Sequence, residues 1–314
     1  MFDLEKFNKQ TYTVMTETID QEVQVFNAQS GGTIELVAKP FQGDFDINAS
    51  FKLIAGLVRH RDVNNGTNAI NQKRLEQIKD VGVKIAAGTD EIVWESAQYR
   101  WIMQNPELAA VKIGEQLAKG QIANMLNSGI KSAVSAIRGN TDVTLDKGEQ
   151  ALDYALLTQA GALFGDRSNA IKAWILHSGA LTKLQLKALA NSERLFTYDS
   201  VAVFRDPFGR VFVVTDSPDL VDTNKFNVLG LTEGGVVIAN QNDFDGITTH
   251  ATGKENIQRT YQAEWSYGVS VKGYAWDIAA GGANPNAATL ATPTNWKKTA
   301  TSNKDTAGVL LITQ

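Results

Sequence analysis

Residues 105–138 have the sequence NPELAAVKIGEQLAKGQIANMLNSGIKSAVSAIR, and this stretch decides the fold. Its apolar residues recur every three or four positions, the spacing that gathers them on one face of an α-helix. Asn105 can cap the helix, Pro106 suits its first position, and Gly139-Asn140 ends it. At 1.5 Å per residue such a helix is roughly 50 Å long. It is too long for a compact domain to wrap, so the sequence predicts an extended subunit that completes its burial against neighbours.

The composition excludes several classes of protein. The chain has 314 residues, 43% hydrophobic and 20% charged, and can bury a substantial core. It has no cysteine, which excludes disulfides, thiolate catalysis and cysteine-ligated metal centres. Its net charge of -4 argues against a protein whose main task is to grip nucleic acid. No apolar run approaches the roughly 20 residues that cross a bilayer, and the N-terminus lacks the order of a signal peptide. We therefore expect an intracellular chain with no membrane partner.

Charge is distributed unevenly along the first quarter of the chain. Residues 1–50 carry eight acidic and three basic side chains, whereas residues 51–84 carry seven basic and three acidic ones. Opposite charges on two segments can steer and orient a contact between copies. A protein surface is a better partner for the basic segment than phosphate, because no aromatic residues are interleaved with its cations. The candidate contact residues between subunits are five cations of this segment: Lys52, Arg59, Arg61, Lys73 and Arg74.

The first hundred residues predict an arm followed by a long loop. No single period persists over residues 1–30, which predicts an extended arm with at most one short helical piece. Strands are predicted over 33–39 and 78–85. The excursion between them, residues 41–75, is longer than ordinary loops and predicts a hairpin-like projection from the body.

The rest of the chain alternates helix and strand, which makes the fold class α+β. We expect helices over 149–164 and 181–190, a buried strand over 173–176, and a hairpin over 200–216 whose turn at 206–209 has type I residues. Residues 226–239 predict one strand in which closely spaced glycines mark a bulge. A long strand over 257–276 and a last one over 308–313 complete the pattern.

Two motifs invite a chemical function and then fail its requirements. His177-Ser178 follows an apolar strand, but a nucleophile elbow needs glycine two residues before the serine, and Leu176 is there. Adjacent strand residues also point to opposite faces, so His177 and Ser178 are a poor pair for mutual hydrogen bonding. We expect Ser178 to cap the next helix. The segment 240–246 resembles a calcium loop, but Gln241 and Thr252 occupy two key ligand positions. We therefore predict no enzyme, no metal and no cofactor.

The order of arm, long loop, long helix, α/β segment and return strand resembles the major capsid proteins of tailed bacteriophages, which have the Hong Kong 97-type fold. Residues 174–180 (WILHSGA) and 209–216 (GRVFVVTD) resemble the core of that family's axial domain. Residues 267–276 (YGVSVKGYAW), with Asn284-Pro285 and Asn295-Trp296, resemble its return through the peripheral domain. The resemblance is strongest to the gp-thirteen-like branch and covers nearly the whole chain in order.

The resemblance implies a division of the chain. Residues 1–32 would be the N-terminal arm, 33–104 the extended loop with its flanking strands, and 105–140 the spine helix. Residues 141–255 would be the axial domain, and 256–314 the return through the peripheral domain.

The resemblance also implies partners and location. Hexamers and pentamers of the chain would tile an icosahedral shell around double-stranded DNA, held without sequence-specific binding. Assembly would take place in the cytoplasm of a bacterial host and lead to the virion. A portal, and a separate scaffold or decoration protein, would be partners, because no charged coiled-coil prefix indicates a fused scaffold. Some relatives join lysine to asparagine covalently, but nothing identifies a partner here, so that bond is not predicted. The alternatives are an encapsulin-like compartment and, from another class, a soluble α/β hydrolase that uses Ser178 and His177.

Overall fold

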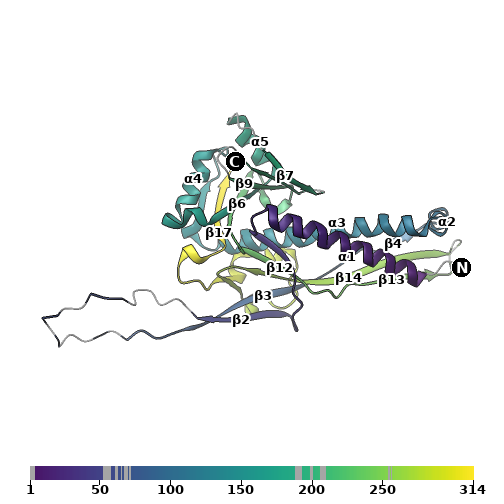
Figure 1. Cartoon of the computed structure of the whole chain (residues 1–314), viewed down its shortest axis with the longest axis horizontal. Coiled ribbons are helices and arrows are strands. Elements are labelled where there is room, and N and C mark those ends of the chain that lie inside the picture. Colours follow the sequence, from purple (N-terminus) through teal and green to yellow (C-terminus); the bar gives the residue numbers. More distant parts are fainter. Residues whose placement is uncertain are drawn as a thin grey trace.

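The computed structural model is elongated, with a hairpin protruding from one end and a long helix reaching toward the other (Figure 1). It describes residues 4–51, 58–60, 63–64, 66, 70, 72–187, 193–198, 201–205, 210–253, 255 and 257–314. In this part of the chain no helix has the length and apolar character needed to span a bilayer.

The predicted long helix is confirmed as α3 (Pro106–Arg138). Proline occupies its first turn, Glu107 lies at the positive end of the helix dipole and Arg138 at the negative end, as the dipole favours. Asn105 stands at the N-cap position, although its side chain makes no capping hydrogen bond. Most of the predicted apolar face is buried, but Leu108 is half exposed. The helix is preceded by a shorter helix, α2 (Ser96–Gln104), which lies between the strands of the loop and α3 in the sequence.

Two sheets flank α3. Among the described residues, the larger sheet has nine strands: β1 (Ile34–Ala38), β2 (Phe45–Phe51), β3 (Gln77–Gly88), β4 (Ile92–Trp94), β12 (Val236–Asn240), β13 (Asp245–Ala251), β14 (Gln258–Val271), β15 (Tyr274–Trp276) and β16 (Trp296–Lys298). Its main path runs β1-β12-β14-β15-β16, and β3 and β4 pair with β14 on the side opposite β12 and β13. The predicted strands 33–39 and 78–85 are confirmed within it. The strand predicted over 257–276 is present only to Val271, as β14, because the chain then turns and returns antiparallel as β15.

The smaller sheet has eight described strands: β5 (Thr144–Lys147), β6 (Ile171–Leu176), β7 (Glu193–Tyr198), β8 (Val201–Arg205), β9 (Val211–Thr215), β10 (Val221–Asp222), β11 (Lys225–Thr232) and β17 (Gly308–Thr313). The predicted buried strand is confirmed as β6, the last strand as β17, and the hairpin as the antiparallel pair β8–β9. The type I turn predicted at 206–209 lies outside the described residues. Helices α4 (Tyr154–Ala162) and α5 (Ser178–Lys187) are associated with this sheet (Figure 1).

The prediction of one strand over 226–239 is wrong, because the chain changes sheets there. β11 belongs to the smaller sheet and β12 to the larger one. A register shift does occur between Leu231 and Thr232, but Gly234 and Gly235 form the turn that follows it. Gly234 has a φ of 61°, and a Cβ on Gly235 would lie 2.9 Å from the carbonyl oxygens of Thr232 and Ala307. The glycines therefore permit a close-packed crossing between the two sheets.

The prediction of an extended N-terminal arm is also wrong. Residues Leu4–Gln29 form the 26-residue helix α1, which lies along α3 (Figure 1). Its buried residues are Phe7, Thr11, Met15, Ile19 and Phe26. Because Thr11 is polar and the apolar residues Tyr12 and Val25 are exposed, an apolar pattern does not reveal the helix. Gly114 of α3 lets the helices approach closely, since a Cβ there would lie 2.9 Å from the Thr11 carbonyl oxygen.

The predicted projection is present as the antiparallel pair of β2 and β3, in register from Phe45 with Val83 to Phe51 with Gln77. The strands leave the body together and end in the protruding part of the molecule (Figure 1). Two segments cross the divisions expected from the sequence: β12 and β13 join the sheet of β14, whereas β17 joins the sheet of β6 and β11.

Candidate functional site

The structure offers no catalytic arrangement at His177 and Ser178. The Gly179 amide donates to His177 Nδ1 at 3.0 Å, and His177 Nε2 lies 3.5 Å from Asp216 Oδ1. Both ring nitrogens therefore face groups other than the Ser178 hydroxyl, and neither is placed to take its proton. Ser178 begins α5, and its carbonyl oxygen accepts a hydrogen bond from Thr182.

The segment that resembles a calcium loop is tied to the sheet. Both carboxylate oxygens of Asp243 accept hydrogen bonds from Ser266 of β14, one from the backbone amide at 2.7 Å and one from the hydroxyl. Gln241 is buried, and its side chain accepts from the Phe41 amide at 2.9 Å and donates to the Ala239 carbonyl oxygen at 2.9 Å. These polar groups hold the loop in place and are not arranged around a common centre. Across the described residues, no group of three or more His, Asp or Glu side chains could hold a metal ion.

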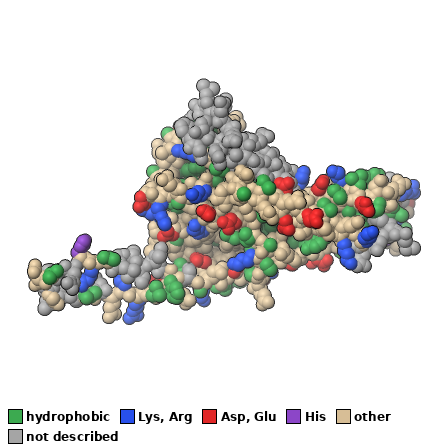
Figure 2. All heavy atoms as spheres, in the orientation of Figure 1, with side chains coloured by type: hydrophobic (Ala, Val, Ile, Leu, Met, Phe, Trp, Pro, Cys, Tyr) green, Lys and Arg blue, Asp and Glu red, His purple; other side chains and the backbone are tan. Residues whose placement is uncertain are grey.

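Three of the candidate contact residues, Arg59, Lys73 and Arg74, lie on the protruding hairpin and are exposed. Lys52 and Arg61 lie outside the described residues. Large apolar side chains are exposed beside the three described cations: Phe51 (63%), Val58 (93%), Val63 (78%), Ile70 (66%) and Leu75 (59%). Figure 2 shows basic and apolar side chains interspersed along this projection. Apolar groups at such exposure gain by contact with another protein surface.

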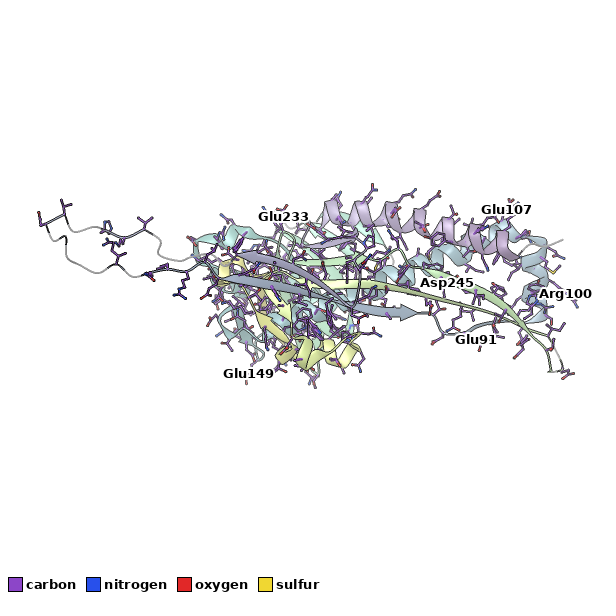
Figure 3. The ribbon with its side chains drawn as sticks, turned by 90° about the horizontal axis from the view of Figure 1, so that it is seen from below. Glu91, Arg100, Glu107, Glu149, Glu233 and Asp245 are labelled. Atoms are coloured by element: carbon purple, nitrogen blue, oxygen red, sulfur yellow. The ribbon has the colours of Figure 1, made fainter. Side chains whose placement is uncertain are left out.

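A group of carboxylates lies along the second half of α1 and just beyond its C-terminal end. Residues 16–38 carry Glu17, Asp20, Glu22 and Glu35 and no Lys or Arg. Glu35 and Glu233 both approach Gly32 in the turn after the helix, and Glu233 lies beside that end of α1 in Figure 3. We call these five residues the acidic end of α1. The last turn of α1 has no basic residue that would offset their charge.

The spine helix meets the larger sheet through a close contact at Gly129 and a hydrogen-bonded tyrosine. Gly129 packs so tightly that a Cβ there would lie 2.7 Å from Cδ1 of the fully buried Ile238. The Tyr267 hydroxyl of β14 donates to Asn124 Oδ1 at 2.6 Å and lies 2.7 Å from the Ser128 hydroxyl. Burial raises the pKa of Tyr267, so the phenol stays neutral and bonded across the physiological range.

The spine helix meets the smaller sheet through a polar contact. Lys131 Nζ lies 3.2 Å from Asp219 Oδ1, and the Arg138 guanidinium donates to Asn227 Oδ1 at 2.8 Å and to Asp222 at 3.4 Å. These side chains line a hollow of about 150 Å³. Burial raises the pKa of the Asp219 carboxyl, and Lys131 opposes that change. The Ser135 hydroxyl, 2% exposed at residue level, finds no hydrogen-bond partner among the described residues.

A model of the Gp13-like family, described as major capsid protein 13-like, matches residues 3–310. The chain belongs to this family. The capsid function predicted from the sequence is thereby confirmed. No curated protein sequence matches the chain.

Solved structures show the fold of this capsid subunit. A chain of the cyanophage Pam1 capsid asymmetric unit is 12% identical, with a TM-score of 0.50, and the match covers 88% of each chain. A chain from Microbacterium phage Oxtober96 is 10% identical, with a TM-score of 0.49, over 91% of this chain and 90% of that one. A chain of the holo-SrpI encapsulin complex from Synechococcus elongatus is 10% identical, with a TM-score of 0.49, over 88% and 84%. The predicted Hong Kong 97-type fold is confirmed.

Sequence reasoning found the basic hairpin from its charge and length. It missed the polar contact between α3 and the smaller sheet, because Lys131 and Asp219 are far apart in the chain. No local signal marks that pair. The acidic end of α1 was visible as composition, but the helix that presents it was not.

Proposed function

We propose that the subunit forms hexamers and pentamers that tile an icosahedral phage head around double-stranded DNA. Membership of a major capsid protein family is the observation that carries this proposal. The shape supports it: a 33-residue spine helix and a protruding hairpin with exposed apolar side chains leave much surface for neighbouring copies. Binding to neighbouring copies stabilises the folded subunit by mass action. The isolated subunit can therefore expose apolar side chains that are buried after assembly.

We assign the parts by the sheets. The helix α1 is the N-terminal arm, and the β2–β3 hairpin is the extended loop. The spine helix with the larger sheet is the peripheral domain, so β12 and β13 are counted there. The smaller sheet, including β17, is the axial domain. This assignment keeps the expected parts and moves only the boundaries that the strand pairing crosses.

The proposed role is structural and not catalytic. The packaged DNA is confined without sequence-specific contacts, which suits a subunit with a net charge of -4. A portal, and a separate scaffold or decoration protein, are the further partners. Assembly takes place in the cytoplasm of the bacterial host, and the mature protein resides in the virion.

Charge complementarity supports a specific contact between copies. The hairpin carries Arg59, Arg61, Lys73 and Arg74, and the acidic end of α1 carries five carboxylates. Attraction between such groups steers encounter and fixes register more than it adds affinity. We propose that the hairpin of one subunit approaches the acidic end of α1 on its neighbour.

A charge-exchange experiment tests this contact. Changing the four hairpin cations to Glu should reduce the yield of assembled particles, while thermal unfolding of the subunit is unchanged. Changing Glu17, Asp20 and Glu22 to Lys in the same chain should restore part of the yield, because the two charges are then exchanged. The control exchanges Arg for Lys and Lys for Arg at the four hairpin positions, which keeps the charge. Normal particle yield from the four-Glu variant would refute the steering role.

A further inference from the structure

The outer edge of β1 is one of the edges of the larger sheet. β1 stands at the end of the main strand order and pairs with β12, and no other described strand pairs with it. The Val236 amide donates to the Thr33 carbonyl, and the Lys39 amide donates to the Asn240 carbonyl. Since successive strand residues direct their backbone groups to alternate sides, the odd-numbered residues face β12. Leu36, at the centre of the strand, therefore directs its amide and carbonyl away from the sheet.

The side chain of Asn27 occupies this position. Its Nδ2 donates to the Leu36 carbonyl oxygen at 2.8 Å, and the Leu36 amide donates to its Oδ1 at 3.1 Å. A residue of a paired antiparallel strand would make the same two bonds. The carboxamide of Asn27 thus imitates the peptide group of a neighbouring strand.

Helix α1 carries Asn27 and runs beside both edge strands on this side of the sheet (Figure 1). Near its other end, Asn8 Oδ1 accepts a hydrogen bond from the Thr248 hydroxyl of β13 at 2.9 Å. The Asn8 contact joins two side chains and does not involve the backbone of β13. Of the two contacts, only that of Asn27 satisfies backbone groups of an edge strand.

A free edge is a template on which a strand of another chain can pair. The copy itself supplies such a strand: β2 pairs with β3 alone among the described strands, and it exposes Ile47 (52%) and Phe51 (63%). We propose that Asn27 is an intrachain strand mimic that keeps β2 of a second copy from adding to β1 in the unassembled subunit. Displacing the end of α1 opens this surface.

Hydrogen exchange and sedimentation of the full-length subunit test the proposal. In Asn27→Ala, the protection of the Leu36 amide should fall about tenfold, as expected for the loss of one net hydrogen bond. The subunit should also form soluble oligomers at concentrations where the unchanged chain is monomeric. Asn8→Ala is the matched control, because it removes a carboxamide of α1 that touches no strand backbone. It should keep Leu36 protected and the subunit monomeric.

A second variant keeps the proposal testable if Asn27→Ala does not fold. Asn27→Asp keeps the size and the acceptor for the Leu36 amide but places an oxygen against the Leu36 carbonyl, so it should also open the edge. Because the chain has no cysteine, the occupant can be identified by disulfide trapping. Copies with Asn27→Ala and Glu35→Cys should cross-link to copies with Asn48→Cys in β2. Oligomers that do not cross-link through β2, exposure of Leu36 without association, or equal behaviour of the Asn27 and Asn8 variants would each overturn the proposal.

Discussion

The spine helix binds its two sheets by different chemistry. Toward the larger sheet it presents Gly129, which packs closely against Ile238, and Ser128, which bonds to Tyr267. Toward the smaller sheet it presents Lys131 and Arg138, which form ion pairs and hydrogen bonds around a hollow. A close apolar contact fixes one arrangement, because small displacements lose dispersion energy steeply. A polar contact with room for water tolerates small displacements. We therefore expect the helix to keep its position against the larger sheet more firmly than against the smaller one.

Deleting buried volume should distinguish the two contacts most strongly. Ile238→Ala should lower the free energy of unfolding by about 2–5 kcal/mol, the usual cost of removing a fully buried branched side chain. Val221→Ala, at the edge of the hollow and only partly buried, should cost about 1 kcal/mol or less. Urea unfolding of the monomeric subunit measures both. Equal losses from the two variants would contradict the distinction between a closely packed contact and a contact that encloses a hollow.

Removing the cation of the polar contact should have an intermediate, pH-dependent effect. Lys131→Met should cost about 1–2 kcal/mol at pH 7, between the values for exposed and buried pairs. Burial raises the folded-state pKa of Asp219 above 3.8, so the folded state binds more protons than the unfolded state between pH 3.8 and that higher pKa. Stability from this group is therefore greatest below that window and is lost as the pH rises through it. Without Lys131 the folded-state pKa of Asp219 rises further, so this pH window widens. The destabilisation caused by Lys131→Met should therefore be smaller at pH 4 than at pH 7.

The double variant Lys131→Met with Asp219→Asn is the control for this titration. It has no carboxyl opposite position 131, so its stability relative to Asp219→Asn alone should not vary between pH 4 and pH 7. A penalty for Lys131→Met that is the same at both pH values would show that Asp219 is not the group responsible.

The smallest difference should come from two serines on the same helix. Ser128→Ala removes a hydroxyl 2.7 Å from Tyr267 and should cost about 1 kcal/mol. Ser135→Ala removes a buried hydroxyl that has no described partner and should change stability by less than about 0.5 kcal/mol, since alanine also favours the helix. Thermal unfolding of the two variants side by side provides the comparison. A larger loss from Ser135→Ala would mean that ordered water in the hollow stabilises the polar contact.

The sequence predicted those parts of the fold that depend on local signals. The helix α3 was predictable because Pro106, Gly139 and a sustained apolar period act within one segment. The helix α1 was not, because the polar Thr11 stands in its buried row and the apolar Tyr12 and Val25 lie outside that row. The strands β11 and β12, on either side of Gly234-Gly235, were predicted as one strand. No local sequence signal shows that they belong to different sheets.

The candidate surfaces divide in the same way. The basic hairpin was predictable from charge and loop length. The roles of Asn27 and Asp219 were not, because each depends on a partner that the folded chain brings to it. Polar residues of this kind look like surface residues in the sequence and become recognisable only through the atoms they contact.

Electron microscopy of the purified full-length protein, combined with its sedimentation profile, tests the capsid function most directly. We predict closed shells, tubes, or rings of five and six subunits. A protein that stays monomeric at high concentration, even when produced together with its scaffold and portal, would contradict the account.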